Sequence, residues 1–559
     1  MGENKIMSNK ILSPTMLWDK FNDSLPLKET VLNSETIGNA IFNYVYFSGR
    51  QVSSQRVRIY GVYAEQKNTQ ANTIVILPDV SGGIDIEIIT HFVNLGYNVL
   101  SVDLAGKVEG KNDFTVYPDK VSYANYEQKG KTFDFIENSA KETCWYEWCA
   151  VSRYAVSYAK SKNPDGKIGL IGINYGANVA WQLTAIDNRV NASAFIFGAG
   201  WMAYKGVYKN LQEEIPLDNE RLKFIAGIDA HSYAQFVKVP VLYLGSTNNE
   251  EFDSERAIDT LQRVDNQGKS WFYFVNNSVN VLDKNSLQNI EIFFDKFISS
   301  KDISLPSTPK ISIECDEESI SYYVNCSNFE EIESVEVFAS SNDMALKNRL
   351  WFVVPLEKEL GDGEFLFKRR VYGFVEFEIS YAVVKYKNGL TLSSKYDFSK
   401  VNVKSNSKIP SVIFSSSKLV TRFVVDDLVD NDLLAGVFSN ENLYDFEKGP
   451  FDILGVSTKN TIISHAIKKF SDVLNDSSFV KFDAYTNVPD TITLTLTTEN
   501  GFEYFVKIEL LGQDLWQNQS INLTDFKTEI GMPIKDFSNI ESITVTSLGS
   551  VLVNNFLIL

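Results

Sequence analysis

The sequence of 559 residues predicts an α/β domain with a mostly parallel sheet and helices on both faces, followed by two all-β sandwich domains. Up to about residue 300, short continuous apolar runs alternate with longer amphipathic stretches, as in a parallel sheet covered on both faces. Two polar segments that contain proline, 299–309 and 404–410, interrupt the chain. After the first of them, short alternating strands replace the helical pattern. We therefore predict domains at 1–302, 310–403 and 410–559.

The first domain is predicted to begin with two antiparallel strands, because apolar and polar residues alternate over 40–47 and 57–64. The strands that follow are continuous apolar runs, which indicate burial on both faces. They are expected at 73–77, 98–102, 168–173, 194–197, 239–244 and 270–274. Amphipathic stretches predict helices at 85–95, 142–160 and 285–298.

The two later domains contain short strands at regular spacing and no helical periodicity, which favours sandwiches. For 310–403, we predict an immunoglobulin- or fibronectin-like domain with strands at 311–314, 319–324, 333–339 and 374–386. For 410–559, the greater length favours a jelly roll with strands at 479–485, 491–497, 505–510 and 542–546.

Composition excludes some classes of partner. The 53 basic and 71 acidic residues give a net charge of −18, which argues against binding to nucleic acid or to an anionic membrane. No apolar run reaches the roughly 18 residues of a membrane-spanning helix. The first residues, MGENKIM, lack the apolar segment of a secretory signal, which predicts a cytoplasmic location unless a leader has been removed. The oligomeric state is not predicted.

The sequence predicts no cofactor and no zinc site. None of the four cysteines has a partner at zinc-ligand spacing, so Cys144, Cys149, Cys315 and Cys326 are predicted to be buried reduced thiols. The latter two flank a predicted hairpin. Three acidic residues in the last domain offer a possible calcium site, although an acidic run is more often a solvated turn. They are Asp426, Asp427 and Asp430.

The segment Gly172-Ile173-Asn174-Tyr175-Gly176 follows an apolar strand and precedes a helix start. This is the context of a G-x-S-x-G nucleophile elbow, in which glycines permit a sharp turn that exposes the middle side chain. Here that side chain is the amide of Asn174. An amide is not deprotonated at neutral pH, so the elbow is predicted without its nucleophile.

The region 15–300 resembles the α/β-hydrolase superfamily, and within it the acetylxylan esterase and cephalosporin C deacetylase type. Besides the elbow, six segments carry the resemblance: 17–19, 26–27, 75–83, 96–103, 240–249 and 289–297. The resemblance implies a serine, an acid and a histidine in that chain order. It also implies an oxyanion hole from the loop after the strand at 73–77, with Val80 and Ser81, and from Tyr175.

On this resemblance, all three catalytic positions carry amides. The serine position is Asn174. The acid position, in Gly245-Ser-Thr-Asn-Asn, is Asn249, or Glu250 after a slip of one residue. The histidine position, in Asn277-Ser-Val-Asn-Val-Leu-Asp283, is Asn280. Since an amide is neither nucleophile, anion nor proton carrier here, the site is predicted to be catalytically silent.

The chain has three histidines, and none lies at the expected base position. His91 is expected to pack against the sheet, and His465 lies in the last domain. His231 is predicted to be structural or capping, although it is also a candidate at the mouth of a cleft. Two alternatives remain open: a relay through Ser81 and His231, and deamidation of Asn174 to a carboxylate nucleophile.

Aromatic residues are the candidate ligand contacts. Trp201 and Tyr204 follow the strand after the elbow, where a lid is expected. Tyr117, Tyr123 and Tyr126 fall in a predicted loop over the cleft, whereas Trp145, Tyr146 and Trp148 are predicted core. The last domain resembles carbohydrate-binding jelly rolls in 516–527, 531–537 and 551–559. Its candidate sugar platforms, for which packing is the alternative, are Tyr485, Tyr504 and Trp516.

The sequence thus favours a catalytically inactive protein of the carbohydrate-esterase type that binds a carbohydrate or an acylated sugar. One alternative is an active acetyl or carboxyl ester hydrolase with a non-standard relay. A second alternative is a structural or protein-interaction scaffold.

Overall fold

The computed structural model describes residues 11–67, 71–210, 217–317, 319–349, 351–371, 374–404, 412–416, 420–421, 424–425, 446–459, 461–469, 471 and 474–559. The chain divides into two compact units. Unit 1 comprises Met1–Gly245, Glu251–Phe272 and Asn289–Leu305. Unit 2 comprises Ser246–Glu250, Tyr273–Gln288 and Pro306–Leu559. Two segments of the α/β region are therefore grouped with the β-rich part of the chain.

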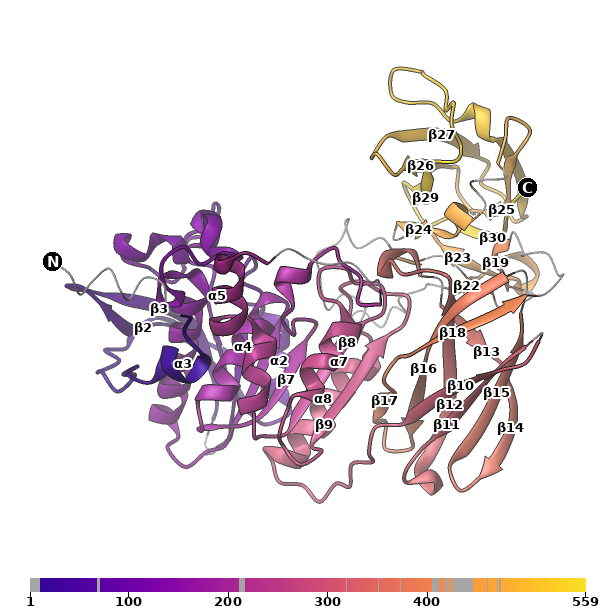
Figure 1. Ribbon diagram of the computed structural model, residues 1–559. Coiled ribbons are helices and arrows are strands. Elements are labelled where there is room, and N and C mark those ends of the chain that lie inside the picture. The colour runs from indigo at the N-terminus through magenta and orange to yellow at the C-terminus, as the bar shows by residue number, and fades with distance from the viewer. Residues whose placement is uncertain are drawn as a thin grey trace. The chain divides into compact units, whose positions relative to one another are not determined.

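A nine-stranded sheet organises the α/β region, in the order β1-β2-β3-β5-β4-β6-β7-β8-β9 (Figure 1). Its strands are β1 Thr30–Ile37, β2 Ala40–Val52, β3 Gln55–Gln66, β4 Thr73–Leu77, β5 Asn98–Val102, β6 Ile168–Ile173, β7 Val190–Ile196, β8 Val241–Ser246 and β9 Ser270–Val275. The pairs β1–β2, β2–β3 and β3–β5 are antiparallel. Strand β4 pairs parallel with both β5 and β6. Parallel pairing continues through β7 to β8. The predicted mostly parallel sheet with an antiparallel start is confirmed.

Helices cover both faces of this sheet. Its helices are α1 Pro14–Trp18, α2 Ile86–Asn94, α3 Cys144–Lys162, α4 Tyr175–Ile186, α5 Asn219–Gly227, α6 Ala230–Tyr233, α7 Ser254–Gln262 and α8 Lys284–Phe297. Two glycines of β6 show the two faces: Gly169 lies against Phe294 of α8, and Gly172 lies against Ala180 of α4. Residues three apart on a strand face opposite ways, so α8 and α4 lie on opposite sides. Phe92 of α2 packs near Phe294, with ring centroids 6.2 Å apart.

The connection from β5 to α3 contains four short 3₁₀ segments, η2 Asp119–Ala124, η3 Tyr126–Gln128, η4 Gly130–Phe133 and η5 Ala140–Glu142. Two buried tryptophans of α3 hold it: Trp145 donates to the Phe133 carbonyl at 2.7 Å, and Trp148 donates to the Ala124 carbonyl at 2.8 Å. The predicted core role of the tryptophans is confirmed.

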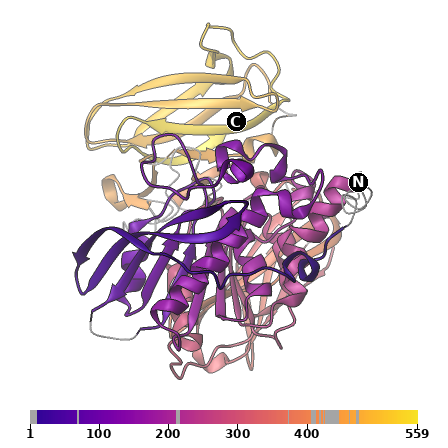
Figure 2. The same ribbon diagram turned by 90° about the vertical axis from the view of Figure 1, so that its left-hand side faces the viewer.

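The remaining part of unit 2 consists of antiparallel sheets, and its described residues after 305 contain no α-helix (Figures 1 and 2). A four-stranded sheet runs β10-β11-β15-β14, and a five-stranded sheet runs β13-β12-β16-β17 with β18 against β16. The strands are β10 Lys310–Cys315, β11 Ser319–Asn325, β12 Ile332–Ser341, β13 Phe352–Val354, β14 Leu356–Gly361, β15 Glu364–Arg370, β16 Phe374–Tyr386, β17 Thr391–Ser393 and β18 Asp397–Lys404.

Two further antiparallel sheets share one hydrophobic core. The first runs β20-β19-β30-β23-β22, with β25 joining β30 to β28, and the second runs β21-β24-β29-β26-β27. Phe482 and Phe556 of the first sheet and Leu494 and Ile543 of the second belong to that core. The strands are β19 Val412–Ser415, β20 Val420–Thr421, β21 Val424–Val425, β22 Phe446–Lys448, β23 Leu454–Ser457, β24 Ile462–Ser464, β25 Phe479–Tyr485, β26 Asp490–Thr498, β27 Glu503–Leu510, β28 Gln517–Asn522, β29 Ile540–Ser547 and β30 Leu552–Ile558.

The thiols are free, as predicted, but they are not all buried. Cys144, Cys149 and Cys326 are buried, whereas Cys315 is exposed. Cys315 is the last residue of β10, an edge strand of its sheet with mostly exposed side chains. The prediction of burial is therefore wrong for this residue.

Two absences concern the described residues only. No helix among them is long and apolar enough to span a bilayer. Within the same ranges, no group of three or more His, Cys, Asp or Glu side chains is placed to hold a metal ion. The calcium prediction at Asp426, Asp427 and Asp430 lies outside the described residues.

Candidate active site

The turn between β6 and α4 has the backbone geometry of a nucleophile elbow. Asn174 adopts φ 53° and ψ −121°, a strained conformation for a residue other than glycine. Close packing holds the turn, because a Cβ atom on Gly176 would lie 2.2 Å from the Pro78 carbonyl oxygen. The strand–turn–helix arrangement predicted from the sequence is present, and Asn174 lies at its apex.

The side chain of Asn174 contacts Asp79, which follows β4 at the same end of the parallel sheet. The Asn174 amide donates to Asp79 Oδ2 at 3.2 Å, and the Ser81 hydroxyl donates to the same oxygen at 2.8 Å. The backbone N–H groups of Ser81 and Tyr175 lie near the Asp79 carboxyl group and lower its pKa. In a working hydrolase, the N–H after the nucleophile stabilises the oxyanion. Here a carboxylate of the chain itself lies beside that donor.

Burial raises the pKa of Asp79, and the hydrogen bonds from Ser81, Asn174 and the backbone offset only part of this effect. The buried atoms Asp79 Oδ1 and Asn174 Oδ1 have no hydrogen-bond partner among the described residues. Two acceptors therefore remain unsatisfied at the apex of the elbow.

Asp79 was not predicted as a site residue. The available signal was an acidic residue at the end of a buried strand, in the segment expected to supply oxyanion donors. The two residues predicted to contribute to an oxyanion hole in this loop differ in solvent exposure: Val80 is buried, and Ser81 is exposed.

The two other predicted positions are in contact with each other within unit 2. Asn249 is fully buried and donates to Asn280 Oδ1 at 2.6 Å and to the Val279 carbonyl at 2.9 Å. This contact supports Asn249, rather than Glu250, as the residue that faces position 280. Both partners are neutral amides, so no proton relay passes between them.

Other contacts within unit 2 hold the loops that carry these two residues. Asn248 donates to the Leu346 carbonyl at 3.0 Å and to the Arg349 carbonyl at 2.8 Å. Tyr381 donates to Asn276 Oδ1 at 3.0 Å. The segments 246–250 and 273–288 are thus bonded directly to residues between β12 and β13 and to β16.

The side chain of Tyr175 lies in an aromatic cluster beside the elbow. Its ring centroid is 5.0 Å from that of Phe133 and 5.1 Å from that of Phe252. Its hydroxyl donates to Glu251, which also pairs with Lys205 at 2.6 Å. Burial and this hydrogen bond raise the pKa of Tyr175, so the phenol keeps its proton.

The histidines have other partners. His231 is buried, stacks on Trp201 at 4.2 Å, and places Nδ1 3.3 Å from Asp229. His91 pairs with Glu291 at 2.9 Å. Burial lowers the pKa of His465 to about 4. The structural role predicted for His231 fits these contacts, and none of them joins it to Ser81.

The predicted aromatic ligand contacts are partly exposed and partly packed. Trp201 donates to Thr260 at 2.9 Å, and Arg256 lies 5.0 Å above the ring of Tyr204. In the last domain, the rings of Tyr485 and Trp516 lie 5.8 Å apart, and Trp516 donates to the Pro450 carbonyl at 3.2 Å. Tyr504 packs against the core of that domain.

The strand order, the elbow and the helices on both faces define an α/β-hydrolase-like domain. Residues 59–271 match the model of the Dienelactone hydrolase family. No curated protein matches the chain. The chain is also similar to solved structures of esterases, at low sequence identity.

Three such structures illustrate this. Acetyl xylan esterase 1 from Thermoanaerobacterium sp. JW/SL YS485 has 14% identity and a TM-score of 0.36, over 49% of this chain and 92% of that one. The acetyl xylan esterase from Paenibacillus sp. R4 has 12% identity and a TM-score of 0.40, over 53% and 100%. Est1E from Butyrivibrio proteoclasticus, solved with ferulic acid, has 13% identity and a TM-score of 0.32, over 44% and 96%.

Proposed function

We propose that this protein is an inactive member of the carbohydrate-esterase type that binds a carbohydrate or an acylated sugar without cleaving esters. The observation that carries the proposal is the contact between Asn174 and Asp79. The residue at the apex of the elbow is an amide, and it bonds a carboxylate that also lies near the N–H group of Tyr175.

Two physical effects oppose ester hydrolysis at this place. The amide of Asn174 cannot attack a carbonyl carbon. In addition, the Asp79 carboxylate competes for the donors that would stabilise an oxyanion, and its negative charge repels one. Either effect lowers acyl-transfer activity, and together they support loss of the reaction.

The same atoms are suited to hydroxyl groups. Asp79 Oδ1 and Asn174 Oδ1 accept hydrogen bonds and have no described partner, and the nearby Ser81 is exposed. Sugar hydroxyls are donors that such acceptors bind without any covalent chemistry.

The first test is an esterase assay on the full chain with p-nitrophenyl acetate and acetylated xylan. We expect no turnover above an Asn174→Ala variant. Turnover at the level of a serine esterase that disappears in Asn174→Ala would refute the proposal.

Calorimetry with xylotriose and an acetylated xylo-oligosaccharide tests binding. The Asp79→Ala variant is expected to lose affinity, whereas Asp165→Ala, at an exposed position, serves as the control and is expected to keep it. Absence of affinity for either sugar would favour the alternative of a structural or interaction scaffold.

One observation favours a second candidate, an active hydrolase that uses Ser81. The Ser81 hydroxyl donates to Asp79, and a carboxylate with a raised pKa is a stronger base than an ordinary one. Covalent labelling of the protein by a fluorophosphonate probe, lost in Ser81→Ala, would support this candidate. We expect no labelling.

A further inference from the structure

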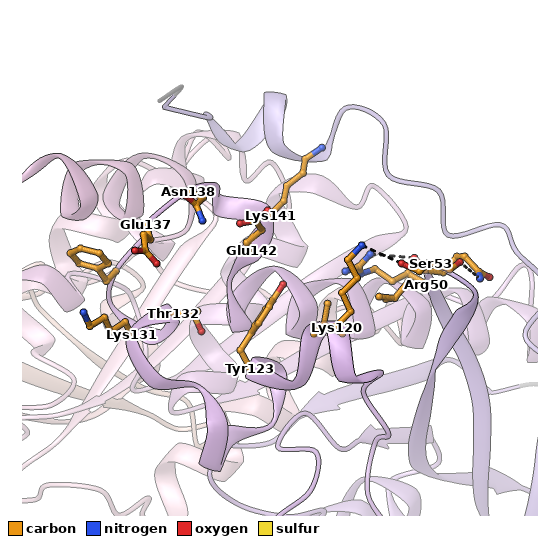
Figure 3. Close-up of a pocket in the computed structure, with 14 residues that line it drawn as sticks. Arg50, Ser53, Lys120, Tyr123, Lys131, Thr132, Glu137, Asn138, Lys141 and Glu142 are labelled. Carbon is orange, nitrogen blue, oxygen red and sulfur yellow. Dashed lines mark hydrogen bonds between the residues drawn. The ribbon is translucent and has the colours of Figure 1, made fainter. Parts of the chain in front are cut away.

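A cavity of about 490 Å³ lies in unit 1, between the β2–β3 turn and the connection from β5 to α3 (Figure 3). Its lining comes from residues 50–53, 120–123 and 131–142. None of the elbow residues Asp79, Ser81, Asn174 and Tyr175 contributes to it. Its volume falls within the roughly 300–1,000 Å³ of small-molecule sites. It is therefore a second place for a ligand, separate from the elbow.

The lining is rich in cations although the whole chain has a net charge of −18. It contains Arg50, Lys120, Lys131 and Lys141, but only two carboxylates, those of Glu137 and Glu142. The cations of the lining thus outnumber its carboxylates, which favours an anionic over a neutral ligand.

Arg50 is already paired. It forms a bidentate ion pair with Glu147, whose side chain is fully buried; one of its hydrogen bonds measures 2.7 Å. Lys120 donates to the Ser53 hydroxyl at 3.2 Å. The ammonium groups of Lys131 and Lys141 have no hydrogen-bond or ion-pair partner among the residues that the structure describes. Up to three ammonium groups are thus available to a ligand.

Tyr123 supplies an aromatic surface between the cations. Figure 3 shows its ring between Lys131 and Lys120, with Lys141 and Glu142 nearby. Burial and the charge of Glu147 raise the pKa of Tyr123, so its hydroxyl remains a donor. A half-buried ring in a cavity that is also lined by the amide of Asn138 suits the apolar face of a sugar ring.

We propose that this cavity binds a carbohydrate that carries a carboxylate, such as a uronic acid. Lys131 or Lys141 would bind the carboxylate, Tyr123 would stack on the ring, and Glu137 and Glu142 would accept sugar hydroxyls. The two carboxylates disfavour a dianionic phosphate, and the guanidinium group of Arg50 in the lining is occupied by Glu147. The inference does not depend on the elbow or on its proposed role.

Calorimetry on the full chain with digalacturonate, xylobiose and glucose 6-phosphate tests this proposal. Digalacturonate is expected to bind, with an affinity that falls as salt is raised, because exposed ammonium groups are screened. The neutral xylobiose and the phosphate are expected to bind about tenfold more weakly or not at all.

The variant Lys131→Gln/Lys141→Gln is expected to weaken digalacturonate binding about tenfold or more. Both lysines are exposed, so the fold is retained, which circular dichroism checks. The control Lys20→Gln/Lys284→Gln removes two exposed lysines outside the cavity and is expected to bind like the parent. Tyr123→Leu is expected to weaken binding without changing its salt dependence.

Three results would overturn the proposal: no digalacturonate binding, equal binding by the cavity variant and its control, or binding of xylobiose as tight as that of digalacturonate. Preference for glucose 6-phosphate would overturn the choice of carboxylate. Esterase activity at the elbow would refute the proposed function but would not change the expected binding of digalacturonate in the cavity. The two proposals can therefore fail independently.

Discussion

Asn249 donates its side-chain amide to Asn280 Oδ1 at 2.6 Å, in loops that belong to unit 2. These are the residues predicted at the acid and base positions. At the apex of the elbow in unit 1, Asn174 in turn bonds Asp79. The amide substitutions therefore come with their own hydrogen bonds, and any attempt to restore catalysis has to replace those bonds.

Returning a nucleophile to the elbow is expected to be insufficient while Asp79 is present. Asn174→Ser places a hydroxyl at the apex of the elbow but leaves the Asp79 carboxylate beside it. Adding Asp79→Ala is expected to raise the rate of ester hydrolysis, because it removes a negative charge that opposes an oxyanion. Hydrolysis of p-nitrophenyl acetate measures it, with the Asn174→Ala form of the same variant as control. Equal activity with and without Asp79 would contradict the role given to this residue.

Asp79 is expected to make stability depend on pH. Its pKa is raised in the folded state, so the folded protein binds the proton at a pH where the unfolded chain has released it. Stability from this group is therefore present at low pH and is lost as pH rises through the folded pKa. The melting temperature of Asp79→Asn relative to the parent is expected to increase from acidic to neutral pH. Parallel curves for Asp79→Asn and the parent would argue against this.

The glycine at the end of the elbow is expected to be required for folding. A methyl group on Gly176 meets backbone oxygens of Leu77 and Pro78, at 2.4 Å and 2.2 Å. Gly176→Ala is expected to cost about 1–3 kcal/mol or more, the range for overpacking. Gly82→Ala is the matched control, since its nearest atom is 3.5 Å away. Urea unfolding compares the two, and equal losses would contradict the prediction.

Removal of one partner of the Arg50–Glu147 ion pair is expected to destabilise the protein more than removal of both partners. Arg50→Met leaves Glu147 buried without its partner, which costs about 3–5 kcal/mol. The double variant Arg50→Met/Glu147→Leu removes both charges and is expected to recover most of that loss. Urea unfolding, followed by the helical circular dichroism signal, measures both variants. A double variant as unstable as the single one would show that packing, not charge, dominates there.

His465 is expected to make the protein sensitive to acid. Its pKa of about 4 lies below the ordinary 6.5, so the unfolded chain takes up the proton first as pH falls. The stability that depends on neutral His465 is complete above pH 6.5 and is lost between 6.5 and about 4. His465→Gln is expected to flatten the melting temperature over that interval, and an unchanged pH dependence in this variant would contradict the prediction.

Much of the fold was predictable because strands that are buried on both faces appear in the sequence as continuous apolar runs. The strands β4, β5 and β6 have the predicted bounds. The predicted start of β8 at Val239 is two residues too early, because Pro240 lacks an N–H group for the ladder. The strand β7 begins at Val190 rather than 194, since its polar first residues hide the pattern. Nearly every residue of β1 is exposed, so its sequence has no alternation of apolar and polar residues that would predict the strand.

The candidate site was predictable only where the residues are contiguous. The elbow could be read from the spacing of Gly172, Asn174 and Gly176, because the turn itself imposes that spacing. The carboxylate of Asp79 reaches Asn174 across 95 residues through the pairing of β4 with β6. The cavity is likewise lined by three separate segments. No local sequence pattern predicts that these segments lie side by side.

The uneven burial of the thiols has a practical use. With Cys144, Cys149 and Cys326 shielded, a maleimide fluorophore added under mildly alkaline conditions attaches selectively at Cys315. The sequence thereby carries an attachment site for one dye on the β-rich unit, and the emission of that dye would report changes in its surroundings without any engineered residue.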